Sequence, residues 1–140
     1  MKTSFLASVI SKYYPATADK INVLIESNVL LEKLAKRVYK KLETSVQKYA
    51  DVMQRLNVLL RMLDAWRTKD YTDISYTAIF LCVAILLYFI NPIDLFPDFI
   101  PVVGGLDDVI LLSFLIKIID KELEKFLIWE KENSTQTAKA

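Results

Sequence analysis

The chain has 140 residues, of which 54% are hydrophobic and 25% charged, with only two glycines and four prolines. This composition excludes general disorder and favours long helices over sheets. The chain has no histidine, and Cys82 is its single cysteine. These counts exclude Ser-His and Cys-His catalysis, zinc sites built from Cys and His, and an intramolecular disulfide. The formal net charge of +1 lacks the basic excess of a nucleic-acid-binding protein, so we expect no nucleic acid partner.

The N-terminal region is the basic part of the chain, because residues 1–73 hold 13 Lys and Arg against 8 Asp and Glu. We expect a short amphipathic helix over residues 4–14. A second short helix through residues 19–27 is expected to begin at Thr17 or Asp19, since both residue types cap helix N-termini.

A long apolar stripe follows from Asn28 to Arg67, with steps of four and three residues. Its members are Leu31, Ala35, Val38, Leu42, Ser45, Tyr49, Val52, Leu56, Leu59, Leu63 and Trp66. This period predicts a long amphipathic helix whose other faces are basic, with a break near residues 49–51 as an alternative. Three roles are open for the helix: packing against the rest of the domain, contact with a second copy or a protein partner through the 31–66 stripe, and binding of its basic face to anionic lipid.

Residues 74–93 form a run of twenty residues without a charge. As a helix they span ~30 Å, which matches the hydrocarbon thickness of a bilayer and predicts a membrane-spanning segment. The alternative is a fully buried central helix of a soluble bundle. In both cases Cys82 is expected to be a small buried apolar residue.

The second apolar run, residues 109–119, is shorter and contains Lys117. It spans ~16 Å alone, so we expect it to complete a helical hairpin or a re-entrant insertion with the residues before it. An amphipathic helix is expected after Ile119, and residues 131–140 are expected to form a disordered tail.

The segment between the two runs holds both glycines and three of the four prolines. Asn91 precedes Pro92, so the first apolar helix is expected to end there. Asp107 or Asp108 is expected at the N-cap of the next helix, and capping of short turns is the favoured role of Asp94 and Asp98.

Two other roles are open for these four aspartates. Carboxylates are ligands of Mg²⁺ and Ca²⁺, so Asp94, Asp98, Asp107 and Asp108 are candidate metal ligands, although we expect no cofactor. Alternatively, Arg61, Arg67 or Lys69 neutralises them, because no Lys or Arg occurs from Asp70 to Ile116.

The segment between the two apolar runs resembles the sequence motif of a known protein family. Its residues are Asn91, Pro92, Asp94, Leu95, Pro97, Asp98, Pro101, Gly104, Asp107 and Asp108, which we call the signature motif. With the flanking helices, over residues 85–130, the motif resembles the YkvA-like family, a bacterial domain of unknown function that also occurs in some eukaryotic membrane-bound ubiquitin ligases. Asn91 stands where the family more often has serine. The resemblance implies a small helical membrane-associated protein and carries over no activity.

We therefore expect an all-α fold with a long basic amphipathic helix, an apolar helical hairpin joined by a Pro/Asp/Gly turn, and an amphipathic C-terminal helix. Residues 1–73 are expected to be a cytoplasmic region, and residues 74–130 a hairpin domain in the cell membrane. The Lys and Arg on both sides of the hairpin predict that both termini are cytoplasmic. We expect a non-enzymatic structural or interaction protein; the alternatives are a soluble or peripheral helical module that oligomerises, and a divalent-cation-dependent enzyme.

Overall fold

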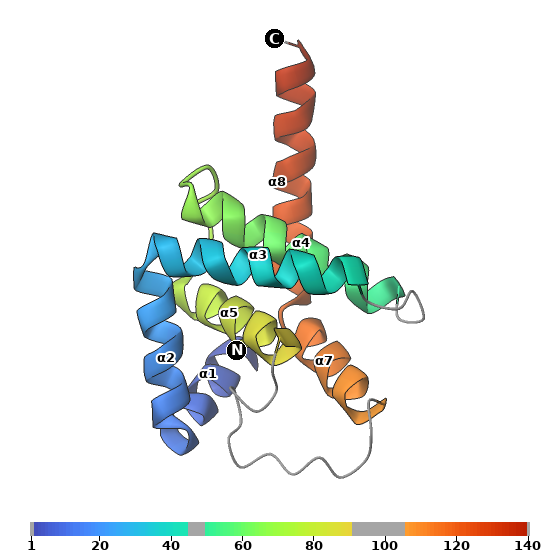
Figure 1. The fold of residues 1–140 in the computed structure, drawn as a ribbon. Coiled ribbons are helices and arrows are strands. Elements are labelled where there is room, and N and C mark those ends of the chain that lie inside the picture. The colour runs from blue at the N-terminus through green and yellow to red at the C-terminus, as the bar shows by residue number, and fades with distance from the viewer. Residues whose placement is uncertain (1, 45–49, 91–105, 140) are drawn as a thin grey trace.

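The structure is a computed structural model that describes residues 2–44, 50–90 and 106–139. Every regular element in these ranges is an α-helix, which confirms the predicted all-α fold (Figure 1). In chain order the helices are α1 (Lys2–Tyr13), α2 (Pro15–Glu26), α3 (Asn28–Thr44), α4 (Ala50–Arg67), α5 (Tyr76–Ile90), α7 (Leu106–Ile118) and α8 (Asp120–Lys139).

Local signals account for several helix starts. The Ser27 hydroxyl accepts a hydrogen bond from the amide of Leu30 at the start of α3, at 3.2 Å. The Ser75 hydroxyl accepts one from the amide of Ala78 at the start of α5, at 3.1 Å. These bonds satisfy amides that have no partner inside the helix. The second helix begins earlier than predicted, because proline suits the first helical position, and Thr17 is therefore inside α2.

The apolar stripe of residues 31–66 belongs to two helices rather than to one. α3 and α4 contact each other, and both contact α5. The stripe residues Leu31, Ala35, Val38, Val52, Leu56, Leu59 and Leu63 are buried in the core. A straight helix over residues 28–67 would be ~60 Å long, whereas folding back allows both halves to cover α5. The stripe is therefore occupied by packing within the chain.

α5 is the central helix of the bundle and contacts α1, α2, α3, α4 and α7 (Figure 1). Every residue from Ala78 to Phe89 is buried, including Cys82 as predicted. The regions 1–73 and 74–130 thus pack together, with the first four helices covering the apolar one.

Within the described ranges, no helix combines the length and the apolarity needed to cross a bilayer. The predicted membrane-spanning segment at residues 74–93 is therefore not supported. The run is uncharged because protein covers α5 on all its sides, and a helix surrounded by protein needs no polar face. The other alternative drawn from the sequence, a buried central helix, describes the position of α5.

The second apolar run forms α7, which contacts α4 and α5. α8 then leaves the bundle, and its C-terminal half projects away from the other helices (Figure 1). α8 extends to Lys139, into the range 131–140 for which the composition predicts disorder. No proline or glycine occurs there, so the helix continues with one hydrogen bond for each added residue.

α4 ends in a Schellman motif, which is a turn that usually has glycine in the left-handed conformation. The amide of Lys69 donates to the carbonyl of Trp66 at 3.0 Å, and the amide of Asp70 donates to the carbonyl of Ala65 at 2.9 Å. Lys69 occupies the glycine position with φ of 67°. A side chain with a Cβ is strained in this conformation.

Lys69→Gly is expected to raise the free energy of unfolding by about 1 kcal/mol, because glycine adopts positive φ without the Cβ clash. Urea denaturation followed by circular dichroism measures the change. Lys69→Ala keeps the Cβ but removes the charge, and is expected to stay within about 0.5 kcal/mol of wild type. Equal gains in both variants would show that the charge matters and not the backbone.

Candidate functional site

The C-terminal end of α5, where the signature motif begins, receives a lysine from α3. Lys41 Nζ donates to the carbonyl of Phe89 at 2.5 Å and to that of Ile90 at 3.4 Å. The same ammonium lies 4.8 Å from the centroid of the Phe89 ring. The last carbonyls of a helix carry partial negative charge and lack helical partners, and Pro92, two residues further on, has no N–H to offer. Lys41 therefore stabilises the end of the central helix.

Most of the signature motif lies outside the described residues. This holds for Asn91, Pro92, Asp94, Leu95, Pro97, Asp98, Pro101 and Gly104. Asp107 and Asp108 lie in the first turn of α7, which begins at Leu106. The predicted N-cap position is thus wrong by at least two residues. Carboxylates in a first turn still favour the helix, because the N-terminal end of the helix dipole is positive.

Two of the three basic residues expected to neutralise the aspartates, Arg61 and Arg67, have partners among the described residues. Arg61 forms a two-pronged ion pair with Glu130 of α8, at 2.9 and 3.0 Å. Arg67 donates to Asp64 at 3.3 Å and to Asn28 at 3.1 Å. Both arginines therefore tie helices of the bundle together.

The predicted cation site stays a prediction. Among the described residues, no group of three or more His, Cys, Asp or Glu side chains is placed to hold a metal ion. Asp94 and Asp98 lie outside those residues, as do the side chains of Asp107 and Asp108.

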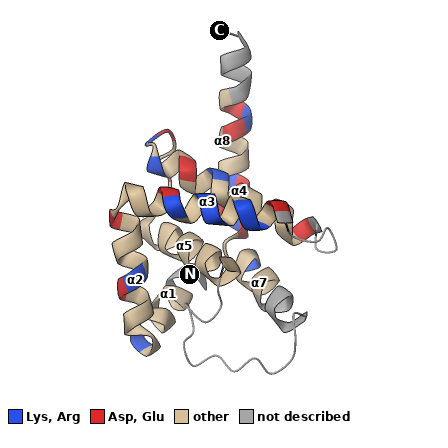
Figure 2. Cartoon of the chain, in the orientation of Figure 1, with Lys and Arg blue, Asp and Glu red and all other residues tan. Residues whose placement is uncertain are grey.

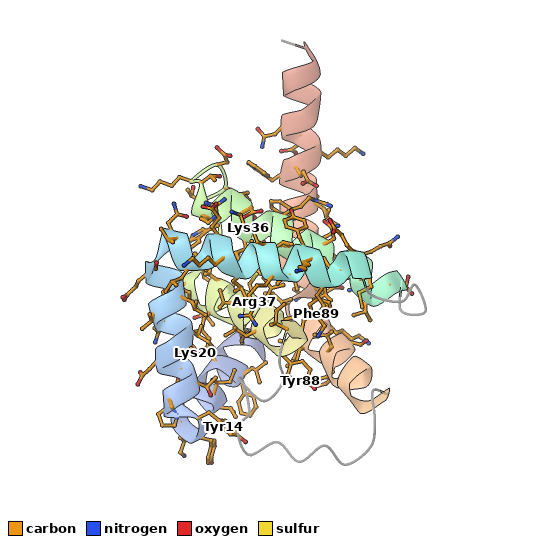
Figure 3. All side chains as sticks on the ribbon, viewed as in Figure 1. Tyr14, Lys20, Lys36, Arg37, Tyr88 and Phe89 are labelled. Atoms are coloured by element: carbon orange, nitrogen blue, oxygen red, sulfur yellow. The ribbon has the colours of Figure 1, made fainter. Side chains whose placement is uncertain are left out.

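The outer surface of α3 carries four exposed basic side chains, Lys33, Lys36, Arg37 and Lys40, which we call the α3 basic face. Their spacing of three and four residues places them on one side of the helix, opposite the buried Leu31, Leu34, Ala35 and Val38. Figure 2 shows the blue segments along this side of α3, and Figure 3 shows Lys36 and Arg37 extending to either side of the helix.

One acidic residue of α3 pairs with this face. Glu32 pairs with Lys36 at 3.3 Å, and both side chains are largely exposed. Such a surface pair is worth only about 0.3–0.5 kcal/mol, so it leaves Lys36 available for a stronger anionic partner. Lys41 continues the basic surface toward the end of α5. The α3 basic face thus adjoins the point at which the signature motif begins.

Nucleophilic chemistry at Cys82 is disfavoured by its surroundings. The thiol is fully buried in α5 and donates a hydrogen bond to the carbonyl of Leu59 at 3.6 Å. Burial raises the pKa of the thiol far above its ordinary value. Since the thiolate is the reactive form, Cys82 is a packing residue.

The sequence identified the basic residues of α3 from their helical spacing. It gave no role to Lys41, because its partners are 48 and 49 residues away and contacts at that separation leave no local pattern. The contact of Arg61 with Glu130, 69 residues away, likewise leaves no local pattern. The pairing of Arg61, Arg67 or Lys69 with the aspartates stays a prediction, because those carboxylates lie outside the described side chains.

Comparison with known proteins adds two findings. The family model described as "Protein of unknown function (DUF1232)" matches residues 78–114, which run from α5 into α7. A protein of Bacillus subtilis (strain 168), named "Uncharacterized membrane protein YkvA", is 32% identical over 77 residues, covering 55% of this chain and 73% of the relative. No solved structure matches the chain.

Proposed function

The chain belongs to the YkvA-like family, and from this premise we propose that it is a peripheral membrane protein that binds anionic lipid through the α3 basic face. The relative is named a membrane protein, and the described helices include none that crosses a bilayer. A surface contact with the lipid headgroups is consistent with both findings. We propose a binding function and no catalysis.

The observation that carries this proposal is the division of α3 into two faces. Its apolar residues Leu31, Leu34, Ala35 and Val38 are buried against the bundle, so they are not available for insertion into lipid. The basic residues of the opposite face are exposed and lie on the outside of the molecule (Figure 2). Binding through this face is therefore electrostatic, unlike that of an interfacial helix with an inserted apolar side.

The magnitude of the attraction is sufficient for reversible binding. Each Lys or Arg near an anionic surface contributes about 1 kcal/mol, so four such groups contribute about 4 kcal/mol before orientational costs. Salt weakens this attraction, because the screening length is only about 8 Å at physiological ionic strength.

The proposal also bears on the C-terminal end of α5. The contact of Lys41 with the carbonyls of Phe89 and Ile90 sets the end of α5 beside the α3 basic face. A membrane bound to this face would thus lie close to Ile90, the last residue of α5. Since the cytoplasmic leaflet carries the negative surface potential, the proposal places the protein and both of its termini on that side.

Vesicle sedimentation tests the proposal with a variant in which Lys33, Lys36, Arg37 and Lys40 are all changed to Gln. Wild-type protein is expected to sediment with vesicles that contain anionic phospholipid and to remain in the supernatant with neutral vesicles. The variant is expected to lose at least roughly tenfold in affinity, because four cationic contacts disappear. Added salt is expected to release the wild-type protein.

The matched control removes the same amount of charge elsewhere, by changing Lys12, Lys69, Lys117 and Lys121 to Gln. These four residues are exposed and come from different parts of the fold, so the control variant is expected to keep most of its affinity. Equal losses in the two variants would show that net charge alone controls binding. Equal binding to neutral vesicles would show that apolar insertion controls it. Either result overturns the proposal.

A further inference from the structure

A cleft lies between the corner that joins α2 to α3 and the turn that follows α4, on the left of the molecule in Figure 1. We call it the α2–α4 cleft. Its volume is about 540 Å³, which is within the range of cavities that hold small molecules. Its lining combines apolar and charged side chains, which include Ile25, Glu26, Leu31, Trp66, Arg67 and Lys69.

The apolar part of the lining suits an aromatic or aliphatic group. Ile25 and Leu31 are buried, with 7% and 1% of their surface exposed, and both line the cleft. Trp66 is half-buried and contributes its indole from the end of α4. Aromatic rings pack favourably against each other and against aliphatic side chains, so this lining provides a place for the apolar body of a ligand.

Arg67 supplies a fixed cation beside these apolar groups. Its Nε donates to Asp64 at 3.3 Å and its Nη1 donates to Asn28 at 3.1 Å, so the guanidinium is held on two sides. Glu32 lies 3.8 Å from the same Nη1. Among the described residues Nη2 has no hydrogen-bond partner. A donor of the guanidinium is therefore available to a ligand, although Asp64 and Glu32 offset part of its charge.

Lys69 supplies the second cation, and its backbone is strained. The side chain is exposed and lines the cleft, and its ammonium has no ion-pair partner in the described part of the chain. The φ of 67° is one that glycine adopts without cost at this position of the turn. Strain of this kind is concentrated at functional sites, where a particular side chain is needed. A binding role for the ammonium accounts for a lysine where glycine would be more stable.

We propose that the α2–α4 cleft binds a small aromatic carboxylate. One carboxylate oxygen accepts a hydrogen bond from Arg67 Nη2, the other accepts one from Lys69 Nζ, and the ring lies against Trp66. Charge-assisted hydrogen bonds of this type are stronger than those between neutral groups. Lys69 is the main determinant, because it is the cation without an acidic partner. Glu26 is exposed in the same lining and opposes the binding of an anion.

Isothermal titration calorimetry with 3-phenylpropionate as the probe tests the ligand class. The probe is expected to bind the wild-type protein. Phenethylamine has the same ring with a positive charge, and acetate has the carboxylate without the ring, so each is expected to bind at least roughly tenfold more weakly. No binding of 3-phenylpropionate in the millimolar range, or equal binding of either control compound, would overturn the proposal.

Lys69→Gly separates binding from folding. This variant is expected to bind 3-phenylpropionate at least roughly tenfold more weakly, although relief of the backbone strain makes it more stable than wild type. Lys69→Arg keeps the cation and the Cβ, and is expected to bind more tightly than Lys69→Gly. Wild-type affinity in Lys69→Gly would contradict the role of the ammonium.

Glu26→Gln provides a test in the opposite direction. Because it removes a negative charge from the lining, it is expected to bind 3-phenylpropionate more tightly than wild type does. Weaker binding in this variant would show that the carboxylate of Glu26 helps to hold the probe, which contradicts the proposed charge selection.

Fluorescence locates the bound probe. The chain has two tryptophans, so Trp129→Phe leaves Trp66 as the only fluorescent indole. Addition of 3-phenylpropionate to this variant is expected to change the Trp66 emission with the dissociation constant that calorimetry gives. Heat of binding without any change in emission would place the probe elsewhere and overturn the proposal.

Vesicle sedimentation distinguishes a free carboxylate from a lipid headgroup as the occupant of the cleft. The cleft does not include the α3 basic face, so Lys69→Gly is expected to sediment with anionic vesicles as wild type does. A loss of vesicle binding in Lys69→Gly that parallels its loss of 3-phenylpropionate binding would show that the cleft holds a lipid headgroup, and would overturn the proposal. Failure of lipid binding through the α3 basic face leaves the calorimetric test of the cleft unaffected.

Discussion

Phe80→Ala is expected to lower the free energy of unfolding by about 3–5 kcal/mol, the usual cost of removing a buried aromatic ring. Phe80 belongs to the central helix α5 and is only 4% exposed. Its ring is covered by other helices of the same chain, so truncation leaves a cavity in the core. A loss of this size is a large part of the total stability of a small domain.

The matched control is Phe5→Ala, because Phe5 is 72% exposed on α1. It removes the same atoms from a surface position and is expected to change the stability by less than about 0.5 kcal/mol. Urea denaturation monitored by circular dichroism measures both variants. Similar small changes in the two variants would contradict the central, protein-covered position of α5.

Tyr71→Ala is expected to cost about 3–5 kcal/mol, because this side chain joins α8 to the bundle. Tyr71 is 2% exposed and its ring lies 5.2 Å from that of Phe126 and 4.9 Å from that of Trp129, between centroids. Without the ring, α8 keeps the buried side chains of Leu123 and Phe126 and the surface ion pairs of Arg55 with Asp120 and of Arg61 with Glu130, but the aromatic cluster around Phe126 and Trp129 loses its third ring. Exposed pairs of this kind contribute little. Thermal and urea denaturation measure the loss.

Tyr71→Phe separates the ring from the hydroxyl. The hydroxyl of Tyr71 is buried and has no hydrogen-bond partner among the described residues. Phenylalanine keeps the aromatic contacts and removes the unpaired polar group, so this variant is expected to be as stable as wild type or more stable by about 1 kcal/mol. A loss above that size would show that the hydroxyl makes a stabilising bond.

The dependence of stability on alkaline pH provides a second comparison between the wild-type protein and Tyr71→Phe. Burial raises the pKa of Tyr71 above its ordinary value of 10.0, and Glu122 and Asp73 raise it further against the effect of Lys125. The folded state thus favours the neutral phenol. This contribution is complete below the pKa of the unfolded state and is lost as the pH rises above about 10. Relative to wild type, Tyr71→Phe is expected to gain stability as the pH rises through this range.

The sequence was informative wherever one local feature sets the structure. α1 ends at Tyr13, before Pro15 as predicted, and α5 ends at Ile90, next to the predicted end at Asn91. Asn28 begins α3 as the start of the apolar stripe indicates. The α3 basic face was also visible, because charge at helical spacing maps directly onto one side of a helix.

The sequence was misleading about what surrounds an apolar helix, because the pattern of residues does not distinguish lipid from protein. An uncharged helix of about twenty residues is the same pattern in lipid and in the centre of a bundle, and the structure surrounds α5 with protein. The heptad-like stripe likewise indicates an apolar face but not its partner. Here it belongs to two helices, α3 and α4, that fold back on each other over α5.

The sequence by itself therefore determined the all-helical class, several helix boundaries and the charge distribution along α3, because propensity, capping and periodicity act over a few residues. Only the tertiary structure decided that α5 is covered by protein, that Lys41 binds the carbonyls at its end, and that Arg61 and Arg67 pair within the bundle. Most of these contacts join residues far apart in the sequence, and their free energy depends on burial and geometry that no local pattern records.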